Sequence, residues 1–290
     1  MNYNLTIKEL EELLSSPEYN QKQYDSHTHP HFERLNEYGG IATLFDDMCD
    51  QLGRLPSQSE YIAAGFLRAE SYFSPRKGKK PDVTKYWGKN DMYSATFNWN
   101  DPELQKAVKK RLSRSYPSYL AEYTTIIQLK QLYPTFQIGT NGYLDRTAGV
   151  DIVVASPYSD RLVYIHVTSS SQQSKDTLNE KKTRWGMAKD KNGKKFWFER
   201  NFNKGHINLA FSKFNETDST RIINGNPIFK AEHLQLVIDT AMSVPDPNNR
   251  MFDTWWFKDD TKIEGHQLCE LHHFLLINKI DSNGIGDIWV

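Results

Sequence analysis

Two neighbouring aliphatic segments constrain the fold more than any other part of the chain. The segments "GVDIVVA" at 149–155 and "RLVYIHVTSSS" at 161–171 are separated by only five residues. Side chains alternate between the two faces of a strand. The spacing therefore predicts two consecutive strands, with Asp151 on the face of Val153 and with His166 and Thr168 sharing one face.

The segments around these strands predict an α/β fold. The stretch "TFQIGT" at 135–140 indicates a strand before the pair, a helix is expected at 175–185, and further strand material follows from about residue 195. The apolar segments that begin at 233 and 271 are compatible with helix or strand, because periodicity does not separate the two for short apolar runs.

A helix, a tight turn and a second helix are predicted over residues 41–66. The helical spacing of apolar residues breaks at Gly53 and begins again at Ser57. Ser57 and Glu60 have the spacing of a capping box, which marks the start of a helix.

The stretch "GRLPSQSEY" in this region resembles the helix-turn-helix repeats appended to some DNA-cleaving enzymes. In such repeats the second helix enters the major groove. The alternative is a helical hairpin that packs against the core. The resemblance implies base contacts by three side chains and a phosphate contact by a fourth: Ser57, Gln58 and Ser59 at bases, and Arg54 at phosphate.

A domain boundary is expected near residue 100. The segment 73–91 is rich in Gly, Pro and Lys and indicates an exposed linker. Asp101 then caps a helix that has Pro102 at its first position. We therefore expect an N-terminal helical DNA-recognition region over 1–100 and an α/β domain over 101–290.

A separate helix is predicted after Pro117, running to about Leu132. Its inward apolar stripe comprises Tyr119, Tyr123, Ile126, Ile127 and Leu129. Glu122 is the exception, because it lies one turn from this stripe and its carboxylate is directed toward the apolar side. An unpaired charge in such a place is costly.

Positive charge is concentrated in two stretches although the formal net charge is zero. Residues 76–114 contain eleven bases and four acids, and residues 175–204 contain ten bases and four acids. Such stretches suit a polyanion, because Lys and Arg neutralise phosphates, and they are also typical of solvated lysine-rich loops. The DNA contacts expected from these two stretches are Lys109, Lys110, Arg111, Lys181 and Lys182.

The order of helix with Glu122, strand, strand with Asp151, and strand with His166-x-Thr168 resembles the PD-(D/E)XK nuclease superfamily, which has the restriction-endonuclease-like fold. The resemblance covers about residues 115–185. It implies a mixed central sheet flanked by helices, with Glu122, Asp151 and His166 facing a metal ion. The family's lysine position holds Thr168 here, and Lys175 is the nearest lysine on the next expected helix.

The chemistry implied by this resemblance is metal-assisted phosphodiester cleavage. A divalent ion lowers the pKa of a water and stabilises charge on the phosphate. Carboxylates suit Mg²⁺ or Mn²⁺, whereas an imidazole shifts preference toward softer transition metals. The structural alternative is that Asp151 bonds a turn and His166 is a core histidine. Asp145 is a second candidate for the strand acid.

Other readings of the sequence find less support. His27, His29 and His31 resemble the His-x-His opening of amidohydrolase-type metal enzymes, but no aliphatic barrel strand precedes them and no eightfold strand-helix alternation follows. Neither a phosphate-binding Gly-rich loop nor a dinucleotide-binding turn occurs, so no nucleotide cofactor is expected.

The chain is expected to be a cytoplasmic protein. Two cysteines, Cys49 and Cys269, are too few for a disulfide framework. No apolar run approaches the roughly 18 residues of a membrane span. The amphipathic, acid-containing N-terminal segment is unlike a secretion signal.

Three functions are therefore considered. The first is a metal-dependent endonuclease that cuts double-stranded DNA, with a homodimer possible because a duplex has two strands. The second is a catalytically inactive DNA-binding protein on the same fold, for which Thr168 in place of lysine is the argument. The third is a protein-interaction module whose basic stretches are only solvated.

Overall fold

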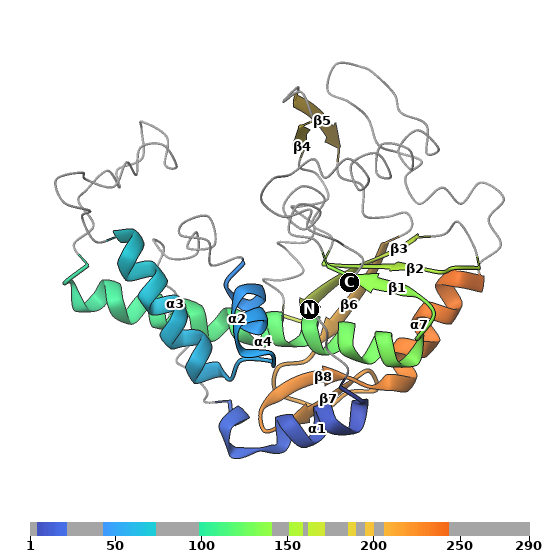
Figure 1. The fold of residues 1–290 in the computed structure, drawn as a ribbon, viewed down its shortest axis with the longest axis horizontal. Coiled ribbons are helices and arrows are strands. Elements are labelled where there is room, and N and C mark those ends of the chain that lie inside the picture. Colours follow the sequence, from blue (N-terminus) through green and yellow to red (C-terminus); the bar gives the residue numbers. More distant parts are fainter. Residues whose placement is uncertain are drawn as a thin grey trace. The chain divides into compact units, whose positions relative to one another are not determined.

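The computed structural model describes residues 5–21, 43–73, 99–140, 151–158, 162–171, 185–189, 195–199 and 206–243 (Figure 1). The chain divides into two compact units. Unit 1 consists of Met1, Leu13–Leu120 and Asn224–Asn226, and unit 2 consists of Asn2–Glu12, Ala121–Ile223 and Pro227–Val290. The boundary thus falls inside a helix, about twenty residues after residue 100, near which the sequence predicts it.

Helices make up most of the described part of unit 1. They comprise the end of α1 (Ile7–Ser15), the short 3₁₀ helix η1 (Pro17–Tyr19), α2 (Leu44–Leu52), α3 (Gln58–Phe73) and the first part of α4 (Pro102–Leu132). Asp101 begins α4 as expected, because its carboxylate accepts the Glu103 N–H at 3.0 Å.

The turn between α2 and α3 confirms the sequence prediction in detail. Gly53 adopts φ +65° and its N–H bonds the Cys49 carbonyl at 2.9 Å, which ends α2 with a left-handed residue. Glu60 accepts the Ser57 N–H at 2.8 Å, and the Glu60 N–H points back to the Ser57 hydroxyl at 3.4 Å. This reciprocal pair is the predicted capping box.

The core of unit 1 is built on an aromatic cluster. Phe45 lies 5.8 Å from Tyr61 and 6.1 Å from Tyr116, measured between ring centroids, and Tyr119 lies 5.9 Å from both Phe45 and Tyr61. Ring pairs at such separations add stabilisation beyond the area they bury. Burial raises the pKa of Tyr61 to about 12, so its hydroxyl stays protonated and remains a hydrogen-bond donor at neutral pH.

The prediction of a separate helix after Pro117 is wrong, because α4 runs without interruption from Pro102 to Leu132. A proline inside a helix removes one backbone hydrogen bond and introduces a clash, but tertiary packing can compensate for this cost. Here the residues on both sides of Pro117 are held in place. Tyr116 is fully buried and donates to the Pro56 carbonyl at 3.0 Å, and Leu120 is also fully buried.

The second part of α4 is buried almost all round rather than along one stripe. Every residue from Tyr123 to Leu129 is buried. Three polar side chains in this stretch donate to carbonyl groups: the hydroxyls of Thr124 and Thr125 donate to the Ala121 carbonyl, and the Gln128 amide donates to the Phe229 carbonyl at 2.9 Å. A helix buried on all sides is a central element of its unit.

Unit 2 contains a mixed four-stranded sheet in the order β1-β2-β3-β6. Its strands are β1 (Gln137–Gly139), β2 (Ile152–Ala155), β3 (Leu162–Ser169) and β6 (His206–Phe211). The pairs β1–β2 and β2–β3 are antiparallel, whereas β3 and β6 are parallel. The three strands expected between 135 and 168 are therefore confirmed.

Helices α4 and α7 (Ala231–Ser243) cover one face of this sheet (Figure 1). Ile126 and Leu129 of α4 and Leu234 and Ile238 of α7 are packed into one cluster with alternate residues of the strands, such as Ile165. The segment that begins at 233, left open by its periodicity, is thus a helix. Val153 and His166 on the opposite face are also buried, so the sheet is covered on both sides at its centre.

Two hairpins complete the described structure: β4 (Trp185–Lys189) with β5 (Lys195–Glu199), and β7 (Thr220–Ile223) with β8 (Asn226–Phe229). The second turns at Asn224 and Gly225, with φ of 49° and 79°. Positive φ at both central residues is typical of a two-residue hairpin turn that matches the twist of its strands. The Asn224 amide donates to the Leu14 carbonyl at 3.0 Å within unit 1.

None of the helices in the described ranges is long and apolar enough to pass through a membrane.

Candidate functional site

The candidate site lies at one edge of the sheet in unit 2. Because β2 runs opposite to its neighbours, it begins at the edge where β1, β3 and β6 end. We call this the carboxyl edge. It comprises Thr140, Asp151, Thr168–Ser171, Ser212 and Lys213. In open α/β sheets, ligands bind preferentially outside the carboxyl ends of strands.

Asp151 is held at this edge by two hydrogen bonds to β3. Its N–H donates to the Ile165 carbonyl at 3.0 Å, and its carboxylate accepts the Val167 N–H at 2.6 Å. Pairing of β2 with β3 ends at Ile152 and Ile165, so the carboxylate satisfies a backbone N–H beyond the end of the ladder. Asp151 thus has a structural role, which the sequence left open as an alternative to a catalytic one.

His166 and Thr168 occupy the face of β3 that points away from α4 and α7. His166 is only 2% exposed, whereas Thr168 is half-buried. The shared face of these two residues, predicted from strand alternation, is confirmed by the parallel pairing of Tyr164, His166 and Thr168 with successive even-numbered residues of β6.

Glu122 approaches the same edge from α4. It lies ten residues before the end of α4, which is about 15 Å along the helix axis. The chain then turns back through β1. The Thr140 hydroxyl, one residue after β1, donates to the Glu122 carboxylate at 3.3 Å. The helix carboxylate is therefore half-buried and partnered, rather than an unpaired charge in the core.

Serines supply hydroxyl groups where β3 and β6 end. The Ser170 N–H donates to the Phe211 carbonyl at 2.8 Å, which joins the two strand ends. The hydroxyls of Ser169 and Ser171 lie 3.0 Å apart. Ser169 is buried, whereas Ser170 and Ser171 are exposed. The exposed hydroxyls are neutral donors at an edge that also carries carboxylates.

The metal site predicted from the sequence is not assembled in this structure. Among the described residues, no three His, Cys, Asp or Glu side chains form a group that could hold a metal ion. Glu122, Asp151 and His166 therefore do not constitute a three-residue ligand set here. Asp145 and Lys175 lie outside the described residues, as do His27, His29 and His31.

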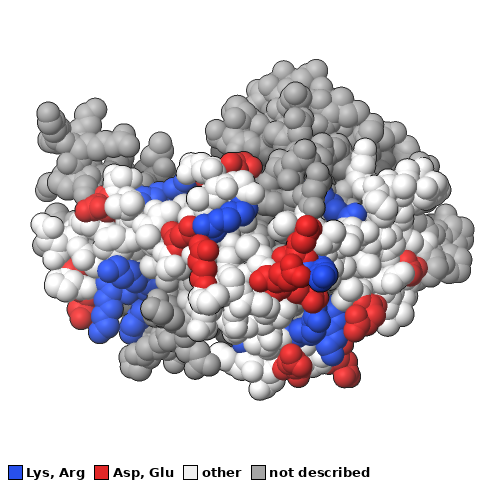
Figure 2. Space-filling model, turned by 60° about the horizontal axis from the view of Figure 1, so that its bottom comes forward, with Lys and Arg blue, Asp and Glu red and all other residues white. Residues whose placement is uncertain are grey.

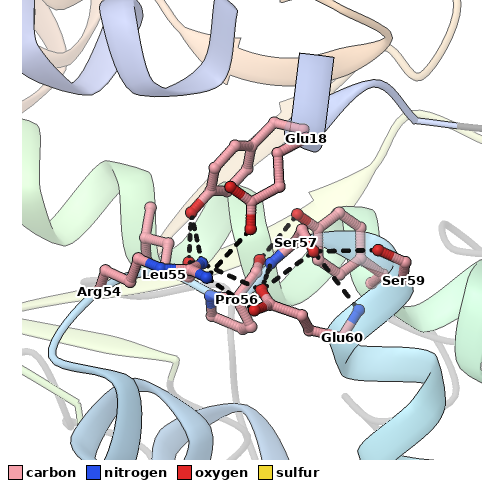
Figure 3. A network of polar contacts seen from close by, with 9 residues as sticks. Glu18, Arg54, Leu55, Pro56, Ser57, Ser59 and Glu60 are labelled. Carbon is pink, nitrogen blue, oxygen red and sulfur yellow. Dashed lines mark hydrogen bonds and ion pairs between the residues drawn. The ribbon is translucent and has the colours of Figure 1, made fainter. Parts of the chain in front are cut away.

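A second polar cluster lies in unit 1, around the turn between α2 and α3 (Figure 3). The Arg54 guanidinium donates to both carboxylate oxygens of Glu60 at 2.6 and 3.0 Å, and to the Glu18 carboxylate at 3.0 Å. It also donates to the Tyr19 hydroxyl at 3.1 Å and the Leu55 carbonyl at 3.0 Å. Arg54 is therefore occupied by partners within unit 1.

The three residues expected at DNA bases differ in their exposure to solvent. Ser57 is fully buried and Gln58 is 4% exposed, whereas Ser59 is exposed. In this arrangement the first two side chains cannot touch a base edge. The Ser57 hydroxyl instead donates to Glu60 at 3.0 Å, as a helix cap. These contacts favour the alternative of a hairpin that packs against its own core.

Hydrogen bonds within this cluster shift the pKa values of Glu60 and Arg54. Burial alone raises the pKa of the Glu60 carboxyl, but hydrogen bonds from Arg54 and Ser57 outweigh it, so that the pKa of Glu60 is lowered overall. The bond to Glu60 raises the pKa of Arg54, which remains a cation. The cluster is therefore an ion pair at neutral pH.

Two basic residues along α4, Lys106 and Lys109, contact other side chains. Lys109 lies over the Phe66 ring, 4.6 Å from its centroid, and Lys106 pairs with Glu103 at 3.9 Å. Lys110 and Arg111 are half-buried. Figure 2 shows Lys and Arg in small separate groups beside Asp and Glu on the face it presents. Lys181 and Lys182 lie outside the described residues.

Sequence reasoning missed two contributions to the carboxyl edge, Thr140 and the segment Ser212–Lys213. The second follows β6 directly, and strand material was predicted there without its place in the sheet. A signal existed for Thr140, because it follows the strand expected at 135–140. The pairing of β6 with β3 joins segments about forty residues apart, which local patterns do not specify.

Comparison of this chain with family models, with curated proteins and with solved structures found no match.

Proposed function

We propose that this chain is a DNA endonuclease of the restriction-endonuclease-like class that hydrolyses phosphodiester bonds in duplex DNA with Mg²⁺ or Mn²⁺. Supporting this proposal is the succession of α4 with Glu122, β1, β2 preceded by Asp151, and β3 with His166 and Thr168. Asp151 belongs to the carboxyl edge, and Glu122 on α4 is hydrogen-bonded to Thr140 of the same edge.

One observation carries the proposal: Asp151 lies directly before β2, bonded to β3 through the Ile165 carbonyl, with its carboxylate held by the Val167 N–H. A carboxylate fixed by the backbone is positioned without a mobile side chain to order. Glu122, anchored through Thr140, brings a second carboxylate to that edge. Pre-positioned groups of this kind reduce the entropic cost of ordering a reacting phosphate.

The ion requires fewer protein ligands than the sequence predicts. Mg²⁺ is commonly held by one or two carboxylates together with substrate phosphates and waters. We propose that Glu122 and Asp151 supply these carboxylates without His166, whose burial suits a core residue. A bound ion supplies charge stabilisation to the phosphate and activates water. In this proposal DNA itself completes the site.

The test compares two partnered aspartates. Asp151→Asn keeps a carbonyl oxygen for the Val167 N–H but removes the charge, whereas Asp239→Asn changes a carboxylate that accepts the Tyr133 hydroxyl at 2.6 Å on α7. Supercoiled plasmid is incubated with Mg²⁺ or Mn²⁺, and nicked and linear products are measured over time, with EDTA as a further control. We expect the wild type and Asp239→Asn to cut.

Asp151→Asn is expected to cut at least about 100-fold more slowly, since even changes to residues behind metal ligands cost 10- to 100-fold. Equal cutting by Asp151→Asn and the wild type would remove Asp151 from the proposed site.

A second candidate is a DNA-binding protein on the same fold that does not cut. Two observations favour it: Thr168 stands where the resemblance implies a lysine, and the described residues contain no three-residue ligand group. This candidate predicts salt-dependent duplex binding in EDTA and no nicking by the wild type with either ion. The plasmid assay therefore separates the two candidates.

A further inference from the structure

Among the described residues, two carboxylates lie at or beside the carboxyl edge. Asp151 belongs to the edge, and Glu122 is bonded to Thr140 of the edge. Both carboxylates repel a DNA phosphate when no divalent ion is present. A polyanion can approach such an edge only when cationic side chains offset them.

Lys213 provides positive charge at this edge. It follows β6 by two residues, and β6 lies beside β3 with Ser169 paired to Phe211. The Ser170 N–H bonds the Phe211 carbonyl at 2.8 Å, so the two chains are still side by side where they leave the sheet. Of the described residues that define the carboxyl edge, Lys213 alone is basic.

The surroundings of Lys213 also distinguish it from a solvated surface lysine. Its neighbour Phe214 is 73% exposed, whereas Lys213 itself is half-buried. Lysine stems often lie along the protein while the ammonium reaches the surface. The exposed hydroxyls of Ser170 and Ser171 lie on the adjacent strand end, and such hydroxyls commonly bond phosphate oxygens.

We propose that Lys213 binds a phosphate of the DNA backbone at the carboxyl edge, supplying from β6 the positive charge that Thr168 does not supply on β3. This inference rests on the proposed action on DNA, but it does not require cutting. Lys213 acts here as a binding residue that holds the phosphate beside Asp151.

The experiment measures binding of a fluorescent 20-base-pair duplex by the full chain in EDTA at several salt concentrations. The variants are Lys213→Met, Lys213→Gln and Lys213→Arg. Lys130→Met is the matched control, because Lys130 is a half-buried lysine of α4 near the opposite edge, two residues before the helix ends. Thermal melting of each variant establishes that it is folded, and the Gln variant replaces the Met variant if the latter does not fold.

Loss of one phosphate contact reduces the slope of log affinity against log salt by about 0.9. We expect this reduction for Lys213→Met and Lys213→Gln, with the slope retained in Lys213→Arg and Lys130→Met. An unchanged slope in the Met and Gln variants overturns the inference, as does an equal change in Lys130→Met.

Nicking by the same variants separates this inference from the proposed function. If the wild type binds duplex, the Lys213 variants show the expected reduction in slope and the wild type never nicks plasmid, the role of Lys213 is supported and the nuclease proposal is overturned. A wild type that binds no duplex overturns both.

Discussion

The polar cluster at the α2–α3 turn and the carboxyl edge of the sheet use similar residues in opposite ways. At the turn, Arg54, Glu60 and Ser57 are bonded to one another, and their side chains are buried or half-buried. At the carboxyl edge, the Asp151 carboxylate accepts a backbone N–H and the Thr140 hydroxyl donates to Glu122 of α4. Ser170 and Ser171 remain exposed. The first arrangement is bonded within the protein, whereas the second includes two exposed serines and the half-buried Lys213.

This difference indicates which polar residues are candidates for a functional site. A polar motif in the sequence predicts chemistry at a site only when its groups are not used up by the fold. The resemblance to DNA-reading repeats rests on residues that cap α3 and close an ion pair. At the carboxyl edge, in contrast, the Asp151 carboxylate accepts a backbone hydrogen bond at the end of the sheet.

The largest expected effect comes from breaking the cluster at the turn. Glu60→Ala removes the reciprocal cap of α3 and the main partner of Arg54. We expect a loss of about 2 kcal/mol in the free energy of unfolding, after allowance for solvent screening of side chains that are about one third exposed. Denaturant unfolding measures it. Glu103→Ala, whose pair with Lys106 is exposed, serves as the control and should change stability little.

Replacing Asp151 tests the corresponding structural bond at the carboxyl edge. Asp151→Ala leaves the Val167 N–H without its acceptor, which costs about 1–2 kcal/mol. Asp151→Asn should lose less, because its amide oxygen can accept the same bond. Hydrogen exchange of the Val167 amide, followed by NMR, should quicken in the Ala variant and much less in the Asn variant. Equal protection in both variants contradicts the assigned bond.

Low pH should reduce the stability contributed by Glu60 at the turn between α2 and α3. The folded-state pKa of Glu60 is lowered, so its contribution to stability is fully present above the unfolded pKa of about 4.3 and is lost as pH falls through the folded value. Glu60→Gln removes this titration. The difference in stability between wild type and Glu60→Gln should therefore be constant from pH 7 to 5 and shrink below pH 4. A constant difference down to pH 2 contradicts the assignment.

The smallest effect is expected at Thr140. Thr140→Val removes the hydroxyl that donates to Glu122 but keeps the shape of the side chain. A hydrogen bond at 3.3 Å to a half-buried carboxylate is worth about 1 kcal/mol or less. Thermal melting should show a small decrease, and Thr140→Ser should restore most of it. A decrease larger than that for Asp151→Ala contradicts the ranking.

Local patterns predicted much of the fold. Gly53 and the Ser57–Glu60 spacing specified the turn between α2 and α3, because both act through bonds to residues three or four positions away. The Asp101 cap was predicted for the same reason. The Asn224–Gly225 pair also carried a local hairpin signal, which the sequence reasoning did not use.

Long-range contacts account for what the sequence could not provide. Pro117 predicted a break that the packing of Tyr116 and Leu120 prevents. The resemblance assigned Arg54 to phosphate, but its partner Glu18 lies 36 residues earlier, where no spacing rule connects the two. The same limit applies to Lys213, whose place beside β3 follows from strand pairing alone.

The hairpin turn has a consequence for the order in which the protein matures during synthesis. Asn224 and Asn226 donate side-chain hydrogen bonds to the carbonyls of Leu14, Ser16 and Tyr19. These carbonyls lie more than 200 residues earlier, so the amino-terminal segment must wait for most of the chain to leave the ribosome before it gains these donors. Contacts of such high sequence separation slow folding. A nascent chain halted before residue 224 should therefore leave the segment around Pro17 accessible to protease.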